Sequence, residues 1–142
     1  MKKLLFILVA ILSLCACSSS DEESINNTFT LDGKSYQIDD VTLSIRGVMF
    51  HSGEYTLNIY NCDYEVGKKN YLSAFKNAEA LVMKGNGWYG DILYSWDRDK
   101  IKEDSYVTVK ENDDDNRTYV EAYINDGKKI VKAKYLGTPK VD

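Results

Sequence analysis

Proline and histidine are almost absent from the 142-residue sequence, which contains only Pro139 and His51. A single histidine excludes a metal site built on two imidazole ligands. Any Ser-His or Cys-His catalytic pair would have to use His51, which we expect to be a solvated residue of a turn beside Ser52 and Gly53. Few classes of catalytic site therefore remain open.

Long apolar runs are also missing. The longest covers residues 4–14 and is interrupted by one serine, whereas a membrane-spanning helix needs about 20 apolar residues. Lys2 and Lys3 precede this run, and the small residue Ala16 follows it closely. A positive start, a short apolar stretch and a small residue are typical of an export signal, so we expect residues 1–16 to be a cleaved signal peptide.

Cysteine occurs three times, and two of the three lie at the end of this signal. The segment Leu14-Cys15-Ala16-Cys17 resembles a bacterial lipobox, in which an aliphatic residue and then a small residue precede an acylated cysteine. Cys17 has Ala16 directly before the cut, whereas lipidation of Cys15 would place the bulky Leu14 there. The resemblance predicts lipidation at Cys17, and the alternative is an ordinary signal peptide with an incidental cysteine.

The residues that follow are polar, and Ile25 is the one large apolar residue between positions 18 and 27. Such a segment cannot form a packed core, so we expect residues 17–27 to be a flexible tether and residues 28–142 a single domain. The serines followed by Asp21-Glu22-Glu23 resemble the export tag of surface lipoproteins of the Bacteroidetes. This resemblance to small outer-membrane lipoproteins implies a lipid anchor in the outer membrane. It favours the cell surface, leaves the periplasmic face open, and assigns no role to any residue of the domain.

Positive charge is scarce, with 18 basic against 22 acidic residues and a net charge of −4. Loss of residues 1–16 removes two lysines and no acid, which leaves 16 against 22 and a net charge of −6. Nucleic acid is therefore not an expected partner, because phosphate binding needs a basic patch. Once Cys17 is lipidated, Cys62 has no thiol to pair with. Asp63 and Glu65 beside it disfavour a reactive thiolate, so we interpret Cys62 as structural.

Tyrosine, in contrast, is abundant, with 11 residues, and its alternation with polar residues indicates strands. Asp32-Gly33 predicts a tight hairpin that pairs Phe29 with Tyr36. A second hairpin is predicted between a strand over 41–49 and a strand over 55–60. Further strands are expected around residues 107–109, 120–124 and 131–135.

Two turns are expected between these last strands. Asp126-Gly127 predicts a register in which Glu121 faces Lys132 across the hairpin. The run Asp113-Asp114-Asp115-Asn116 offers carboxylates to calcium, but it lacks the glycine and the distal glutamate of an EF-hand loop. We interpret it as a solvated turn. The sequence therefore predicts no metal site and no cofactor.

The middle of the chain is harder to assign. Helical spacing of apolar residues and an alanine-rich composition favour one short helix near residues 71–83. Bulky side chains occupy even-numbered positions in the next stretch, at Trp88, Ile92, Tyr94 and Trp96. Alternate residues of a strand point to the same face, so this pattern predicts a strand with its bulky face buried. The fold class expected is mainly β, an antiparallel β-sandwich or small barrel of seven to eight strands.

One stretch of this region is a candidate binding site. Trp88 and Tyr89 follow the glycine-rich segment Gly85-Asn86-Gly87, and Asp91 comes two residues after Tyr89. Sugar rings stack on aromatic side chains, and an aspartate can accept hydrogen bonds from their hydroxyl groups. We therefore expect Trp88, Tyr89 and Asp91 to be ligand-binding residues. The alternative is that the large aromatic side chains of this stretch fill the core.

No set of residues has the spacing of a catalytic site, so we expect a non-enzymatic protein. The hypothesis is a lipid-anchored binding or interaction module whose partner is a glycan or another outer-membrane protein. One alternative is a subunit of a surface assembly. A less favoured alternative is a small carboxylate-based hydrolase, which needs two acids roughly 5–10 Å apart in a cleft.

Overall fold

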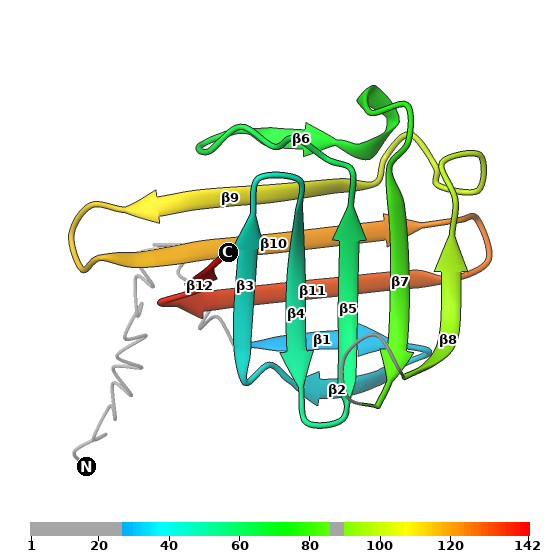
Figure 1. The fold of residues 1–142 in the computed structure, drawn as a ribbon, viewed down its shortest axis with the longest axis horizontal. Coiled ribbons are helices and arrows are strands. Elements are labelled where there is room, and N and C mark those ends of the chain that lie inside the picture. Colours follow the sequence, from blue (N-terminus) through cyan, green and yellow to red (C-terminus); the bar gives the residue numbers. More distant parts are fainter. Residues whose placement is uncertain (1–26, 86–89) are drawn as a thin grey trace, which may run out of the picture.

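Two six-stranded sheets, stacked face to face, form the fold (Figure 1). The computed structural model describes residues 27–85 and 90–142. The strands of one sheet cross those of the other steeply, as in orthogonally packed β-sandwiches (Figure 1). The predicted β-sandwich is confirmed, and the alternative of a small barrel is wrong, because each sheet keeps two free edges.

The first sheet carries the longest strands and has the order β2-β1-β11-β10-β9-β6. All of its neighbours are antiparallel. Its strands are β1 (Thr28–Leu31), β2 (Lys34–Gln37), β6 (Lys69–Tyr71), β9 (Tyr106–Asn112), β10 (Arg117–Asn125) and β11 (Ile130–Gly137).

The second sheet has the order β12-β3-β4-β5-β7-β8, and only the short β12 is parallel to its neighbour. A 3₁₀ turn, η1 (Leu72–Ala74), lies between β6 and β7. The strands are β3 (Asp40–Ser44), β4 (Gly47–Ser52), β5 (Tyr55–Tyr60), β7 (Glu79–Lys84), β8 (Asp91–Trp96) and β12 (Lys140–Val141). The described residues thus form twelve strands and not the seven or eight expected, because the strand expected over 41–49 is divided into β3 and β4, and because β6, β7 and β12 were not expected.

The first hairpin matches its prediction in register and in turn chemistry. Phe29 pairs with Tyr36, and their rings stack with centroids 5.0 Å apart. Asp32 and Gly33 both have positive φ, at 51° and 75°, as a tight two-residue hairpin turn requires.

The strand expected over 41–49 is in fact two strands joined by a turn. Ser44 pairs with Gly47, so Ile45 and Arg46 form a two-residue loop, and Ile45 is 84% exposed. Gly47 lies so close to β5 that a Cβ atom there would stand 2.2 Å from the Ile59 carbonyl oxygen. The alternation of apolar and polar residues continues from β3 through this two-residue loop into β4, which is why the sequence pattern did not reveal the break between the two strands.

The helix expected near 71–83 is also wrong. Only η1 is helical in this stretch, and β7 follows between β5 and β8. Ala78, Ala80 and Val82 are fully buried, which is the period-two pattern of a strand. Burial in the middle of a sheet has outweighed the helical propensity of the alanines, as tertiary context commonly does.

The core lies between the two sheets and is filled by the inward-facing side chains that alternate along the strands of both. In β10 the inward residues are Val120, Ala122 and Ile124. The largest fully buried side chains are Phe29, Phe50, Leu57, Ile59, Leu72 and Ile124. In the part of the chain that the structure describes, no helix is long and apolar enough to span a membrane.

The β10–β11 hairpin has a different register from the one expected. Asn125 pairs with Ile130, so the loop has four residues and Glu121 lies opposite Lys134 instead of Lys132. The Asp126 carboxylate accepts hydrogen bonds from the backbone N–H groups of Lys128 and Lys129, at 2.7 and 2.6 Å, which stabilises this longer loop. The two-residue shift places Tyr123 opposite Lys132.

Candidate functional site

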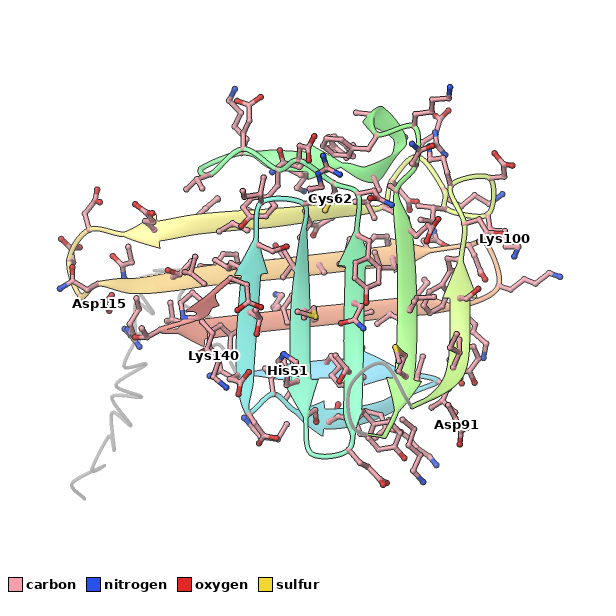
Figure 2. The ribbon with its side chains drawn as sticks, in the orientation of Figure 1. His51, Cys62, Asp91, Lys100, Asp115 and Lys140 are labelled. Atoms are coloured by element: carbon pink, nitrogen blue, oxygen red, sulfur yellow. The ribbon has the colours of Figure 1, made fainter. Side chains whose placement is uncertain are left out.

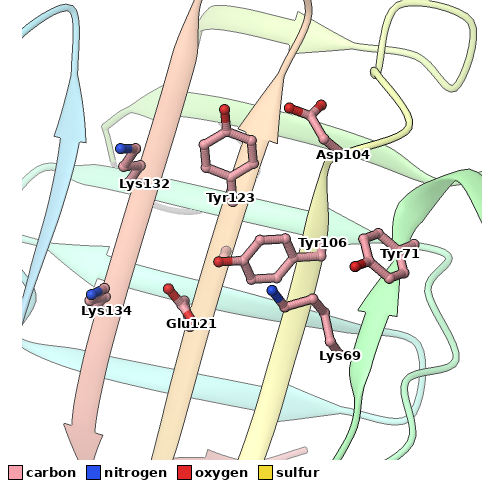
Figure 3. Close-up of a pocket in the computed structure, with 9 residues that line it drawn as sticks. Lys69, Tyr71, Asp104, Tyr106, Glu121, Tyr123, Lys132 and Lys134 are labelled. Carbon is pink, nitrogen blue, oxygen red and sulfur yellow. The ribbon is translucent and has the colours of Figure 1, made fainter. Parts of the chain in front are cut away.

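The outer face of the first sheet carries a shallow depression of about 470 Å³ (Figure 3). It lies over β6, β9, β10 and β11, on the side of the sheet turned away from the core. Its lining combines tyrosines, lysines and two carboxylates, and consists of Lys69, Tyr71, Asp104, Tyr106, Glu121, Ala122, Tyr123, Lys132 and Lys134.

A single row of cross-strand neighbours forms the centre of this depression. Tyr71 pairs with Tyr106, Tyr106 with Tyr123, and Tyr123 with Lys132. Because residues directly opposite each other on adjacent strands share a face, all four side chains project from the outer side of the sheet. We call Tyr71, Tyr106 and Tyr123 the tyrosine row.

The rings of the tyrosine row are in mutual contact. Tyr106 and Tyr123 stack with centroids 5.8 Å apart and planes inclined at 18°, while Tyr71 meets Tyr106 edge-on at 6.4 Å. Tyr71 is 48% exposed, and the other two rings are partly exposed. The row therefore offers partly exposed aromatic side chains to solvent, and their own contacts hold them in place.

Lysines flank the tyrosine row on both sides. The Lys69 ammonium lies over the Tyr106 ring at 4.1 Å from its centroid, and the Lys132 ammonium lies 5.8 Å from the Tyr123 centroid. Lys134, on the same strand as Lys132, is opposite Glu121 in the register. Figure 3 shows Lys132 and Lys134 to one side of the Tyr123 and Tyr106 rings, and Lys69 beside the Tyr106 ring.

The two carboxylates of the depression are engaged within the protein. Glu121 accepts a hydrogen bond from the Tyr106 hydroxyl. Burial, the Glu121 charge and this hydrogen bond together raise the pKa of Tyr106 to about 12, so its hydroxyl keeps its proton. Both carboxylate oxygens of Asp104 accept hydrogen bonds from the Asn125 amide, at 3.0 and 3.2 Å.

The sequence carried only part of the signal for this site. The alternation that buries Val120 and Ala122 also turns Glu121 and Tyr123 outward. The alignment of Tyr71 with Tyr106 depends on pairing β6 with β9, whose paired residues are 35 or more positions apart in the chain. No local pattern specifies that register.

The predicted binding residues lie elsewhere. Trp88 and Tyr89 are outside the described residues. Asp91 is exposed at the start of β8, opposite Lys84, on the second sheet and away from the tyrosine row (Figure 2). A ligand site at Trp88, Tyr89 and Asp91 stays a prediction.

The rest of that predicted strand divides between core and surface. Trp96 is buried, as the alternative interpretation expected, and its indole N–H donates to Asp126 at 2.8 Å. The register between β7 and β8 shifts at Leu93, which breaks the shared parity. Ile92 is consequently 60% exposed, whereas Tyr94 is only partly so.

His51 is not in a turn as expected, but in β4 on the outer face of the second sheet (Figure 2). Its Nε2 lies 3.1 Å from the Thr42 hydroxyl and 3.7 Å from an Asp40 carboxylate oxygen. This carboxylate also accepts from Lys140 at 2.8 Å, so the cluster helps to hold β12 against β3.

Two other candidates for chemistry behave as structural residues. Cys62 is fully buried, and burial together with Asp63 raises the pKa of its thiol to about 12. Within the turn at residues 113–116, Asp115 forms an ion pair with Arg117. No group of three or more His, Cys, Asp or Glu side chains lies close enough to hold a metal ion in residues 27–85 and 90–142.

Comparisons with known proteins add no relative from which a role could be carried over. No protein-family model matches the chain, and neither a curated protein nor a solved structure matches it. The tyrosine row and the groups around it are therefore the features of the chain that bear on its function.

Proposed function

We propose that this chain is a non-catalytic, lipid-anchored binding module that holds carbohydrate on its tyrosine row. The observation that carries the proposal is the alignment of Tyr71, Tyr106 and Tyr123 across three neighbouring strands, above a depression of about 470 Å³. The proposal moves the expected glycan site from the start of β8 to the opposite sheet.

The physical basis is stacking. A sugar ring presents polarised C–H bonds on one face, and the negative face of an aromatic ring attracts them. Tyrosine supplies a large, rigid contact area at a small cost in side-chain entropy, because it has only two side-chain torsions. The three rings are already held by one another, so binding orders few additional side chains.

Hydrogen-bonding groups at the edge suit the hydroxyl groups of a sugar. The ammonium groups of Lys69 and Lys132 are donors, and the carboxylates of Glu121 and Asp104 have further lone pairs. A hydrolase would need one of these carboxylates as a proton donor and the other as a nucleophile or base. Both are instead engaged in hydrogen bonds within the protein, which favours binding over catalysis.

The proposal also includes a lipid anchor, which would attach this module to the outer membrane. Lipidation of Cys17 would fix the domain to the lipid surface through the tether of residues 17–27. The ten residues 18–27 would span roughly 17 Å as a root-mean-square distance if they behave as a random coil, so the domain would lie close to the membrane. Display at the cell surface would give the tyrosine row access to external polysaccharide.

Binding of soluble polysaccharides to the purified full-length protein, measured by isothermal titration calorimetry, tests the proposal. Tyr71→Ala and Tyr123→Ala should each weaken binding about tenfold, a loss of about 1.4 kcal/mol. Tyr119→Ala is the matched control, because Tyr119 projects from the same face of β10 but does not line the depression. Binding that is insensitive to both row variants would overturn the proposal.

A second function, as a subunit of a surface assembly, is favoured by one observation. The edge strand β8 exposes Ile92 and Leu93, by 60% and 41%. An exposed edge with apolar side chains is a template for pairing with another chain. Sedimentation of the full-length protein should then show a concentration-dependent oligomer that Ile92→Lys dissociates.

A further inference from the structure

We infer that the sugar held on the tyrosine row is anionic, a polysaccharide carrying carboxylate or sulfate groups. This inference rests on the proposed function and narrows its ligand class. Its basis is an asymmetry in the depression: the negative groups are engaged within the protein, whereas two of the positive groups are not.

The engaged groups are the two carboxylates. Asp104 accepts twice from the Asn125 amide, and Asn125 is itself held by pairing in the β10–β11 hairpin. Glu121 accepts from the Tyr106 hydroxyl and lies opposite Lys134 across the strand pair. Their charges are thereby partly compensated before any ligand arrives.

The free positive groups are Lys69 and Lys132. Among the described residues neither ammonium forms an ion pair with a carboxylate, and each instead lies near a ring of the tyrosine row. They come from strands on opposite sides of the Tyr106–Tyr123 stack. A sugar chain lying over that stack would have a cation at each side, within reach of acidic substituents.

The charge of the whole protein limits which polyanions fit. The net charge, −4 for the full sequence and −6 without residues 1–16, opposes long-range attraction of a dense polyanion, so recognition has to come from short-range contacts in the depression. Two lysines and three tyrosines suit a sugar chain with spaced charges. Single-stranded nucleic acid also combines stacking with phosphate contacts, but it is usually bound along a continuous basic groove.

The experiment compares ligands by calorimetry on the purified full-length protein. The probes are polygalacturonate for carboxylates, keratan sulfate, which contains no uronic acid, for sulfates, a neutral glucan, and a single-stranded oligonucleotide. Lys69→Met and Lys132→Met remove the charges while keeping the length of the side chains. Lys76→Met is the matched control, because Lys76 is an exposed lysine in the loop before β7 and does not line the depression.

At least one acidic polysaccharide should bind about tenfold more tightly than the neutral glucan. Lys69→Met and Lys132→Met should each remove most of this preference, and Lys76→Met should leave it unchanged. Raising the salt from about 0.1 to about 1 M shortens the Debye length from about 10 to about 3 Å and should weaken acidic ligands selectively. The probe that binds more tightly identifies carboxylate or sulfate as the substituent.

Equal affinity for neutral and acidic polysaccharides, with no effect of the lysine variants, would overturn this inference and leave the proposed function standing. No binding to any polysaccharide would overturn both. Preferential binding of the oligonucleotide would replace a sugar with nucleic acid as the partner and would also overturn both.

Discussion

The Tyr94 hydroxyl donates a hydrogen bond to the Asp32 carboxylate at 2.6 Å and thereby joins the edge of one sheet to a turn of the other. Lys129 completes the contact, with its ammonium 2.8 Å from Asp32 and 4.0 Å from the centre of the Tyr94 ring. The three residues come from β8, the β1–β2 turn and the β10–β11 loop. They tie together the two sheets whose packing supports the tyrosine row.

This contact should make the fold sensitive to acid. The hydrogen bond from Lys129, followed by that from Tyr94, lowers the pKa of Asp32 below its ordinary value of 3.8. A carboxylate with a lowered pKa in the folded state stabilises that state above its unfolded pKa, and the stabilisation is lost as the pH falls through the folded pKa. Asp32→Asn should therefore reduce the acid dependence of the urea midpoint below about pH 4. Asp99→Asn, at an exposed loop carboxylate, is the control. Identical acid profiles for wild type and Asp32→Asn would contradict the prediction.

Trp96 should be a stability residue and not a ligand contact. It is buried, stacks on Tyr94 at 5.9 Å and donates to Asp126. Trp96→Ala should lower the free energy of unfolding by about 3–5 kcal/mol, because it leaves a cavity. Ile92→Ala on the same strand is mostly exposed and should change it by no more than about 0.5 kcal/mol. Urea denaturation of both variants checks this, and a small loss for Trp96→Ala would place that side chain outside the core.

Cys62 should be inert in the folded protein. Its thiol is fully buried and has a pKa of about 12, so almost no thiolate is present near neutral pH. We expect iodoacetamide to label the Cys62 peptide only after denaturation, as mapped by mass spectrometry. Rapid labelling of that peptide under native conditions would show that the interior opens readily or that the thiol is exposed.

Anchoring should depend on Cys17 alone. Bacterial lipoproteins carry at least two acyl chains, which is enough for stable membrane binding. Cys17→Ser should release the protein from the membrane fraction, and the matched change Cys15→Ser should not. Release by Cys15→Ser instead would move the cleavage site two residues upstream.

The sequence predicted those features of the fold that depend on residues close together in the chain. Asp32-Gly33 specified both a turn and the pairing of Phe29 with Tyr36, because few residues accept positive φ. Ile45-Arg46 gave no such signal, and the turn there was missed. Residues 79–84 form a strand because β5 and β8 lie on either side of them, which is information from distant parts of the chain.

The same limit explains the site. Alternation in β10 indicated that Glu121 and Tyr123 face outward, but the following loop is two residues longer than expected, so Glu121 faces Lys134 instead of Lys132 and Tyr123 faces Lys132. The tyrosine row exists only once β6 has paired with β9. A site composed of side chains from four strands depends on three registers, and sequence pattern alone specified none of these three.

The most direct test of the tyrosine row is the affinity of Tyr123→Ala for acidic polysaccharide compared with that of Tyr119→Ala. Both substitutions truncate a partly exposed tyrosine on the outer face of β10, and only Tyr123 lines the depression. Calorimetry with polygalacturonate or keratan sulfate, whichever binds the wild-type protein more tightly, should show about a tenfold weakening for Tyr123→Ala and an unchanged affinity for Tyr119→Ala. Equal affinities for the two variants would contradict a binding role for the tyrosine row.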